Sequence, residues 1–156
     1  MVLVTNKKSR YEYLIYDKFE AGIILSGAEV KSVRSKAASL SDSYVRIEGG
    51  EAFLINAHIS PYKAAFDPSY DPKRQRKLLL SRKEIDHLSG KITTSSLTIV
   101  PTKMYTKHNL VKLEVALARA KKKADKREAL KKRDIEREAE AIVRAPKLKA
   151  QKQLKN

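Results

Sequence analysis

The sequence predicts a mainly β protein, built as a small antiparallel barrel with two to three short helices and a basic C-terminal tail. Three observations carry this prediction. Several short runs alternate between apolar and polar residues, as half-buried strands do. Two of these runs flank Gly49-Gly50, which tolerate the positive φ angles of a tight hairpin turn. From Arg119 onward, the chain has high helix propensity but few apolar residues to bury.

The first third of the chain contains two expected strands and a helix. Residues 11–19 alternate, with Tyr11, Tyr13, Ile15 and Phe19 on one side, which predicts a strand. The segment EAG is expected to break it, and residues 22–27 to resume as a short apolar strand. In residues 28–38 the apolar positions fall three and four apart, so a short helix is expected.

The rest of the chain continues this pattern. Residues 43–59 predict the hairpin, and the three prolines of residues 60–75 predict a long surface loop. Ser81 and Glu84 match a capping box for a helix ending at Gly90. Residues 96–105 and 109–118 predict two strands, with Pro101 at an edge or a bulge. Short strands with few helices favour an oligonucleotide-binding type of barrel.

The net charge of the chain indicates the kind of partner that it binds. Thirty-four Lys and Arg against 18 Asp and Glu give a net charge of +16 over 156 residues. Residues 119–156 alone hold 15 basic and 6 acidic residues, so the tail carries the denser charge. We therefore expect two parts, a barrel at 1–118 and a tail at 119–156. The tail is expected to be disordered alone and helical on a partner that supplies counter-charge.

Several classes of function find no support in the residues. The chain has no cysteine, which excludes disulfides, thiolate catalysis and thiolate zinc sites. His58, His87 and His108 are scattered without metal-ligand spacing, and no phosphate-binding glycine loop or nucleophile motif occurs. We expect no enzyme, no cofactor and no metal. The N-terminus lacks the apolar run of a signal peptide and no stretch approaches a membrane span, so a cytoplasmic protein without a membrane partner is expected.

Basic clusters indicate binding to RNA or DNA. They lie before the first expected strand, on the helix of residues 28–38 and at residues 73–77, and they are compatible with one phosphate-binding surface. A solvated face is the bland alternative for any one cluster. The clusters contain Lys7, Lys8, Arg10, Lys31, Arg34 and the segment KRQRK, and the tyrosines available for stacking are Tyr11, Tyr44, Tyr62 and Tyr70.

Five collinear segments together resemble the SsrA-binding protein family, the small protein B of bacterial trans-translation. They read EAGIILSGAEVKSVR, SDSYVRI, EAFLINAHISPY, KRQRKLLLSRKEI and DKRE, and they span the chain from Asn6 to about Arg137. The resemblance implies an RNA-binding barrel that holds the tRNA-like domain of transfer-messenger RNA (tmRNA). It also implies delivery of that RNA, with elongation factor Tu, to stalled ribosomes. The tail would enter the vacant messenger channel on small-subunit RNA, and a monomer is expected.

The resemblance also assigns residues. It assigns Glu20, Lys31, Arg34, Arg76, Lys77, Leu79 and Ser81 to tmRNA binding, and the basic cluster before the first expected strand adds Lys7 and Arg10 to this set. A helix cap alone would explain Ser81, and a core position would explain Leu79. The set for the decoding centre of the ribosome is Lys121, Lys122, Asp125, Lys126 and Arg127.

Three alanines depart from the family pattern. The family usually has Gly at Ala116 and Ala120, and often an aromatic ring at Ala124 that could stack on a base. Ala120 is expected to start the tail helix earlier.

Two alternatives remain. One is a general RNA-binding barrel, such as a ribosomal protein or an RNA chaperone, and the other is an RNA nuclease or modifying enzyme.

Overall fold

The fold is that of a computed structural model, which describes residues 1–65 and 67–121. Residues up to Ala120 form one compact unit. The helices are α1 (Lys7–Glu12), α2 (Gly27–Arg34) and α3 (Arg82–Ser95), with a 3-10 turn η1 at Lys63–Ala65. The strands are β1 (Val2–Thr5), β2 (Tyr13–Ile23), β3 (Ala38–Ser39), β4 (Tyr44–Glu48), β5 (Glu51–Ile55), β6 (His58–Ile59), β7 (Arg76–Leu79), β8 (Thr98–Lys107) and β9 (Leu110–Ala120).

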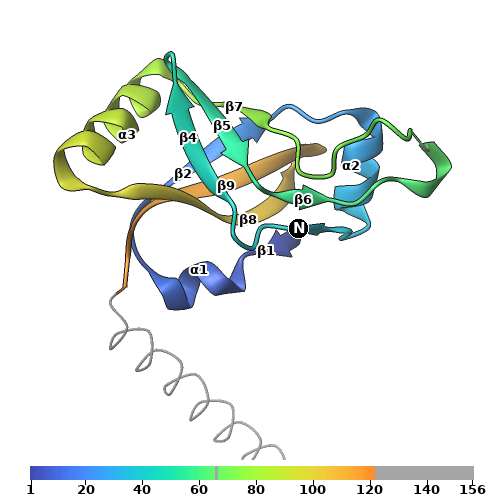
Figure 1. Cartoon of the computed structure of the whole chain (residues 1–156), viewed down its shortest axis with the longest axis horizontal. Coiled ribbons are helices and arrows are strands. Elements are labelled where there is room, and N and C mark those ends of the chain that lie inside the picture. Colours follow the sequence, from blue (N-terminus) through green and yellow to red (C-terminus); the bar gives the residue numbers. More distant parts are fainter. Residues whose placement is uncertain (66, 122–156) are drawn as a thin grey trace, which may run out of the picture. The chain divides into compact units, whose positions relative to one another are not determined.

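Seven strands form one antiparallel sheet that closes on itself. Their order is β1-β8-β4-β5-β7-β2-β9, and β9 pairs again with β8, so six strands make a ring and β1 adds to β8 (Figure 1). The short strands β3 and β6 pair separately. The prediction of a mainly β, small antiparallel barrel with short helices is therefore confirmed. The expected structure of the tail lies outside the described residues.

Alternating side chains from the strands fill the barrel. On β9, Val111, Leu113, Val115 and Leu117 all point inward, as their spacing predicts, while Lys112 and Glu114 stay half-buried on the outside. The inner faces of β4, β5, β7 and β8 add further apolar side chains to this core. The α2 helix buries Val33, and α3 buries Ile85 and Leu88.

The predicted hairpin turn and helix cap are also confirmed. Strands β4 and β5 pair in register around Gly49 and Gly50, whose φ angles of 60° and 74° are positive. The Ser81 hydroxyl accepts a hydrogen bond from the Glu84 backbone N–H, and the Glu84 carboxylate accepts one from Ser81. At Pro101 the pairing of β8 with β9 shifts register, so this proline marks a bulge.

The start of the chain differs from the prediction. Residues 7–12 form α1, so Tyr11 is helical and β2 begins only at Tyr13. The helix is capped by Asn6, whose side-chain oxygen accepts from Ser9 N–H while its amide donates to the Pro101 carbonyl. The segment EAG does not break β2, because β9 pairs with the strand continuously from Lys18 to Gly22. Strand β1 was not predicted.

The predicted end of the second helix was wrong too. α3 continues past Gly90 and ends at Ser95, followed by Ser96 with a left-handed φ of 52°. Ile92 packs against the core and extends the apolar stripe of Ile85 and Leu88, so packing outweighs the ~1 kcal/mol cost of a helical glycine. Ala120 closes β9, so within the described residues it does not begin a tail helix. No helix in residues 1–65 and 67–121 is long and apolar enough to cross a membrane.

Candidate nucleic-acid interface

The basic flank of α2 lies beside the turn that joins β8 to β9. Lys31 and Arg34 are both exposed on this helix, as the sequence predicted. Arg34 donates a hydrogen bond of 2.9 Å from Nη2 to the carbonyl of Asn109 in the turn. The Lys31 ammonium lies 5.3 Å from the ring centre of Tyr62, a cation–π contact with the long loop. Each of the two cations is therefore held at the rim of the barrel by a contact with a neighbouring loop or turn.

Glu20 lies next to this rim, on the outer face of β2. Its carboxylate oxygen Oε2 accepts a hydrogen bond of 2.6 Å from the Tyr105 hydroxyl and one of 3.3 Å from the ammonium of Lys107, just before the turn. The hydrogen bond from Tyr105 and the lysines nearby lower the pKa of Glu20. Burial, together with the adjacent carboxylate, raises the pKa of Tyr105, so the pair stays as phenol and carboxylate.

An exposed apolar strip continues the same face. Leu79 of β7 is 54 % exposed and pairs with Gly22 of β2, which in turn pairs with Lys112 of β9. A Cβ on Gly22 would lie 3.1 Å from the Leu79 Cβ, so the glycine allows Leu79 to lie close against β2 here. The next pair along the row is Lys112 with Tyr105. Leu79 is thus not a core leucine, and the row joins β7, β2, β9 and β8.

Lys112 was missed among the candidates from the sequence. The signal for it was present, because the alternation of the last strand places Lys112 on the side opposite Val111 and Leu113. However, only the pairing of β9 with β2 shows which part of the outer surface Lys112 belongs to. Lys103 was missed for the same reason, and its ammonium lies 5.7 Å from the ring centre of Tyr105.

Lys77 and Ser81 lie on either side of Leu79 along the chain. Lys77 is exposed on the outer face of β7, where its ammonium lies 3.2 Å from a Glu51 carboxylate oxygen. Ser81 is exposed at the start of α3, where its hydroxyl caps the helix. The cap accounts for the serine by itself. A contact of Lys77 or Ser81 with RNA stays a prediction.

Arg76 requires a correction, because its side chain is completely buried. Its guanidinium lies 2.7 Å from the equally buried Glu29 carboxylate and also donates to three backbone carbonyls and the Tyr70 hydroxyl. No part of this guanidinium is left at the surface to meet an RNA phosphate. Arg76 ties the loop of residues 60–75 to α2 and the barrel, and its role is structural.

Arg74 belongs to the same network. Its guanidinium hydrogen-bonds to the Glu29 carboxylate from a partly exposed position. Burial would raise the pKa of Glu29, but the hydrogen bonds from Arg74, the Ser26 backbone and Arg76 outweigh it and lower the pKa to about 2. The segment KRQRK therefore divides into two arginines that bind Glu29 and two exposed lysines, Lys73 and Lys77.

Lys7 and Arg10 belong to α1, which lies at the bottom of the view in Figure 1, whereas α2 lies at the right. Both are exposed on α1, which precedes the start of β2, whereas Glu20 and Gly22 lie near its end. The structure therefore does not bring these two residues to the surface formed by Glu20, Leu79 and Arg34. The idea of one surface for all basic clusters fails on this point.

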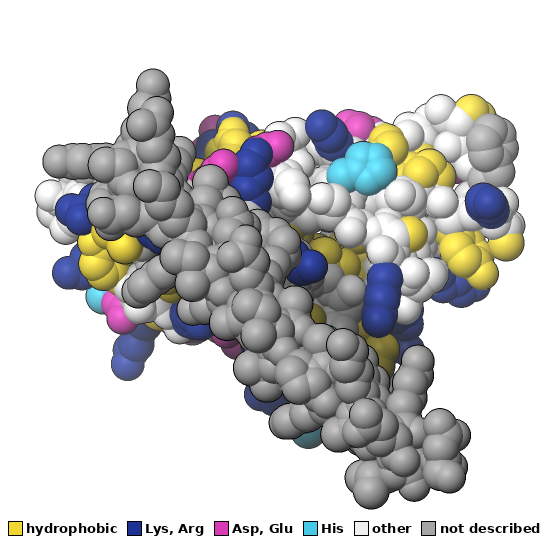
Figure 2. Space-filling view, turned by 90° about the horizontal axis from the view of Figure 1, so that it is seen from below, with side chains coloured by type: hydrophobic (Ala, Val, Ile, Leu, Met, Phe, Trp, Pro, Cys, Tyr) yellow, Lys and Arg dark blue, Asp and Glu magenta, His cyan; other side chains and the backbone are white. Residues whose placement is uncertain are grey.

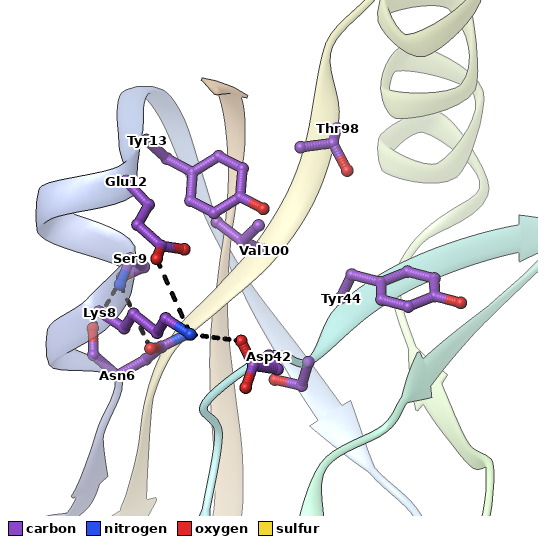
Figure 3. Close-up of a pocket in the computed structure, with 10 residues that line it drawn as sticks. Asn6, Lys8, Ser9, Glu12, Tyr13, Asp42, Tyr44, Thr98 and Val100 are labelled. Atoms are coloured by element: carbon purple, nitrogen blue, oxygen red, sulfur yellow. Dashed lines mark hydrogen bonds and ion pairs between the residues drawn. The ribbon is translucent and has the colours of Figure 1, made fainter. Parts of the chain in front are cut away.

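A pocket of about 350 Å³ opens beside α1 (Figure 3). Lys8 points into it and lies 2.6 Å from Asp42 and 3.8 Å from Glu12, which raise its pKa. Tyr13 and Tyr44 flank the opening, and Tyr44 is 41 % exposed. Since Lys8 is already neutralised by two acids, this pocket is less suited to a phosphate than the rim near Arg34 is.

One face of the molecule, where the described residues are visible, carries more basic than acidic side chains. Figure 2 shows this face, on which lysine and arginine side chains recur and acidic side chains are sparse. Tyr70, one of the four tyrosines expected to be available for stacking, is engaged within the protein, because its hydroxyl donates a hydrogen bond to the Ile59 carbonyl. Lys121 is the last described residue. The predicted tail residues Lys122, Asp125, Lys126 and Arg127 and the departure at Ala124 lie outside the described residues.

The comparisons with known proteins decide the family. The family model described as "SmpB protein" matches residues 3–145. The chain belongs to the SmpB family. It is 52 % identical over 139 residues to the SsrA-binding protein of Sulfurihydrogenibium sp. (strain YO3AOP1), covering 89 % of this chain and 91 % of the relative. It is also 52 % identical over 137 residues to the SsrA-binding protein of Persephonella marina, covering 88 % and 90 %.

A solved structure supports the same family. It is described as "tmRNA-SmpB: a journey to the center of the bacterial ribosome", and it matches with a TM-score of 0.65 at 39 % identity. The match covers 81 % of this chain and 92 % of that one. The resemblance predicted from five collinear segments is confirmed. Among the described residues of this SmpB-family chain, no group of three His, Asp or Glu could hold a metal ion.

Proposed function

We propose that this protein is an RNA-binding adaptor of trans-translation. The barrel binds the tRNA-like domain of tmRNA and delivers it to stalled ribosomes. The observation that carries the proposal is the outer surface formed by Glu20, Leu79, Lys112 and Arg34, which combines cations, an exposed leucine and one positioned carboxylate. Phosphate contacts alone would need only cations, whereas this mixture is suited to a structured RNA with exposed bases and riboses. The relatives named SsrA-binding protein support the choice of RNA.

The remaining parts of the proposal concern partners. Residues 119–156 enter the messenger channel, with Lys121, Lys122, Asp125, Lys126 and Arg127 at small-subunit RNA. The dense positive charge of this segment supports the assignment, because phosphates attract it over a range set by salt. We assign no catalytic step to the chain. Elongation factor Tu reaches it through the aminoacylated tmRNA, and the protein acts as a cytoplasmic monomer.

Binding to the tRNA-like domain, measured against an ordinary tRNA, tests the proposal. Full-length protein and a deletion of residues 119–156 are compared at two salt concentrations. Each phosphate contact contributes roughly −0.7 to −0.9 to the log–log salt slope, so non-specific binding collapses at high salt. We expect the preference for the tRNA-like domain to survive both high salt and the deletion. Affinity that only tracks charge would instead assign a general RNA-binding protein, and RNA turnover would assign an enzyme.

Two variants test the separate roles of barrel and tail. Lys31→Ala with Arg34→Ala should weaken binding to the tRNA-like domain. The matched control, Lys83→Ala with Lys91→Ala, removes the same charge from exposed positions on α3 and should weaken it less. Deletion of residues 119–156 should spare RNA binding but abolish tagging of stalled peptides in a reconstituted translation assay. Normal tagging by the truncated protein would contradict the role of the tail.

A further inference from the structure

Glu20 is an acidic side chain on a surface that would otherwise attract phosphates. Lys107 approaches its carboxylate directly, and the charge of Lys112 on the neighbouring strand also acts on it. A carboxylate repels phosphate oxygens. When ionised it has no proton to donate, so it can only accept hydrogen bonds. If it meets RNA directly, it must therefore meet a part of the RNA other than the backbone phosphates.

The contacts of Glu20 leave one oxygen available. Tyr105 and Lys107 both donate to Oε2, at 2.6 Å and 3.3 Å. Among the described residues, none donates a hydrogen bond to Oε1. Two donors on one oxygen orient the carboxyl group, and the lowered pKa keeps it ionised and able to accept. The side chain is 40 % exposed, so Oε1 is within reach of a ligand.

Tyr105 is itself held in place. It pairs with Lys112 on one side and with Val2 on the other, and Lys103 lies over its ring. Two residues beyond Glu20, Gly22 pairs with the exposed Leu79, which offers apolar surface on the same side of β2. A fixed acceptor beside an exposed leucine is a suitable place for a nucleoside rather than for a phosphate.

We propose that Tyr105 and Lys107 are positioning residues, which aim Oε1 of Glu20 at a neutral hydrogen-bond donor of the bound RNA. The donor is a base amino group or a ribose 2′-hydroxyl, and Leu79 packs against the same nucleoside. This inference rests on the proposed binding of the tRNA-like domain and adds the chemistry read at that surface. It gives the barrel a source of selectivity that salt does not remove.

The first experiment separates an acceptor from a mere negative charge. Glu20→Gln removes one negative charge, so a surface that only attracts phosphates would bind the tRNA-like domain more tightly. We expect binding to weaken by about three- to ten-fold instead, because hydrogen bonds to charged groups are the stronger ones. Glu48→Gln is the matched control, since it removes an exposed acid from the β4–β5 hairpin, and it should bind as the wild type does or slightly better. Tighter binding by Glu20→Gln would overturn the proposal.

The second experiment tests positioning with a double-mutant cycle. Tyr105→Phe should weaken binding by about three- to ten-fold in the wild type and have no effect in Glu20→Ala, which leaves nothing to position. An equal loss in both backgrounds would mean that Tyr105 acts on RNA or on the fold by itself, and would overturn the proposal. If Tyr105→Phe does not fold, as judged by thermal unfolding, Lys107→Met is measured in the same cycle with the same two outcomes.

The third experiment identifies the donor. Transcripts of the tRNA-like domain carry analogues without the amino group for one base type at a time, or 2′-deoxy nucleotides. A substitution that weakens binding to the wild type but not to Glu20→Ala identifies the amino group or the hydroxyl as the donor. Substitutions that affect both proteins equally would contradict the proposal.

The inference and the proposed function fail on different results. That function fails if the wild type does not distinguish the tRNA-like domain from an ordinary tRNA. The double-mutant cycle can then still be measured on whichever RNA binds.

Discussion

Replacing Arg76 with Met should destabilise the fold without changing how the folded protein binds RNA. The guanidinium makes five hydrogen bonds, to Glu29, the Tyr70 hydroxyl and the backbone carbonyls of Ala57, Pro72 and Arg74. Methionine fills a similar volume but donates none of them. Breaking a buried ion pair costs about 3–5 kcal/mol, because a buried charge is left behind.

Arg74 still contacts Glu29 in this variant, so we expect a cost near the lower end, about 3 kcal/mol. Small domains have free energies of unfolding of roughly 5–15 kcal/mol, so the loss is large. With a urea dependence of about 1–3 kcal/mol per molar, the unfolding midpoint should fall by about 1–3 M.

Urea unfolding followed by circular dichroism measures this effect. Arg82→Ala is the matched control, because Arg82 is 78 % exposed and its ion pair is an i,i+4 contact with Asp86 at 3.4 Å. It should change the free energy of unfolding by less than about 0.5 kcal/mol. RNA affinity per folded molecule should be unchanged in Arg76→Met and reduced in Lys77→Ala. A free energy of unfolding within 0.5 kcal/mol of the wild type would refute the structural role of Arg76.

Two further predictions concern pH and close packing. The pKa of Glu29 is lowered from 4.5 to about 2, so its ionised form contributes about 3 kcal/mol of stability above pH 5, which is lost as the pH falls toward 2. Urea unfolding at pH 7 and at pH 3 should therefore show a smaller loss of unfolding free energy for Glu29→Gln than for the wild type. Gly22→Ala places a Cβ 3.1 Å from that of Leu79, which should lower the free energy of unfolding by about 1–2 kcal/mol in thermal unfolding and weaken RNA binding. Gly90→Ala, which has open space around it, should stabilise α3 instead, and equal effects of the two substitutions would contradict the close approach of β2 and β7.

Local patterns in the sequence determined the secondary elements that bury one face. The alternation of β9, the Gly-Gly hairpin and the capping box of α3 all follow from spacing over a few residues, and all are confirmed. The family, too, was readable, because five collinear segments are more specific than any single motif. Lys31 and Arg34 are exposed on one helix, as the three-residue spacing required.

The errors came where a long-range contact outweighed a local signal. Gly90 does not end α3, because Ile92 finds the core, and EAG does not break β2, because β9 pairs with it. Arg76 and Lys77 are neighbours in one basic run, yet strand alternation sends one side chain inward to Glu29 and the other outward.

Only the tertiary structure decided which outward side chains share a surface. Glu20, Leu79, Tyr105 and Lys112 come from four strands, and the register of β2 against β7 and β9 brings them together. Lys7 and Arg10 stay apart from them, because α1 precedes the start of β2 and Glu20 lies near its end. Charge and periodicity are properties of the chain and can be read along it. A binding surface depends on strand pairing between distant residues, and that pairing is set by how the closed barrel buries its core.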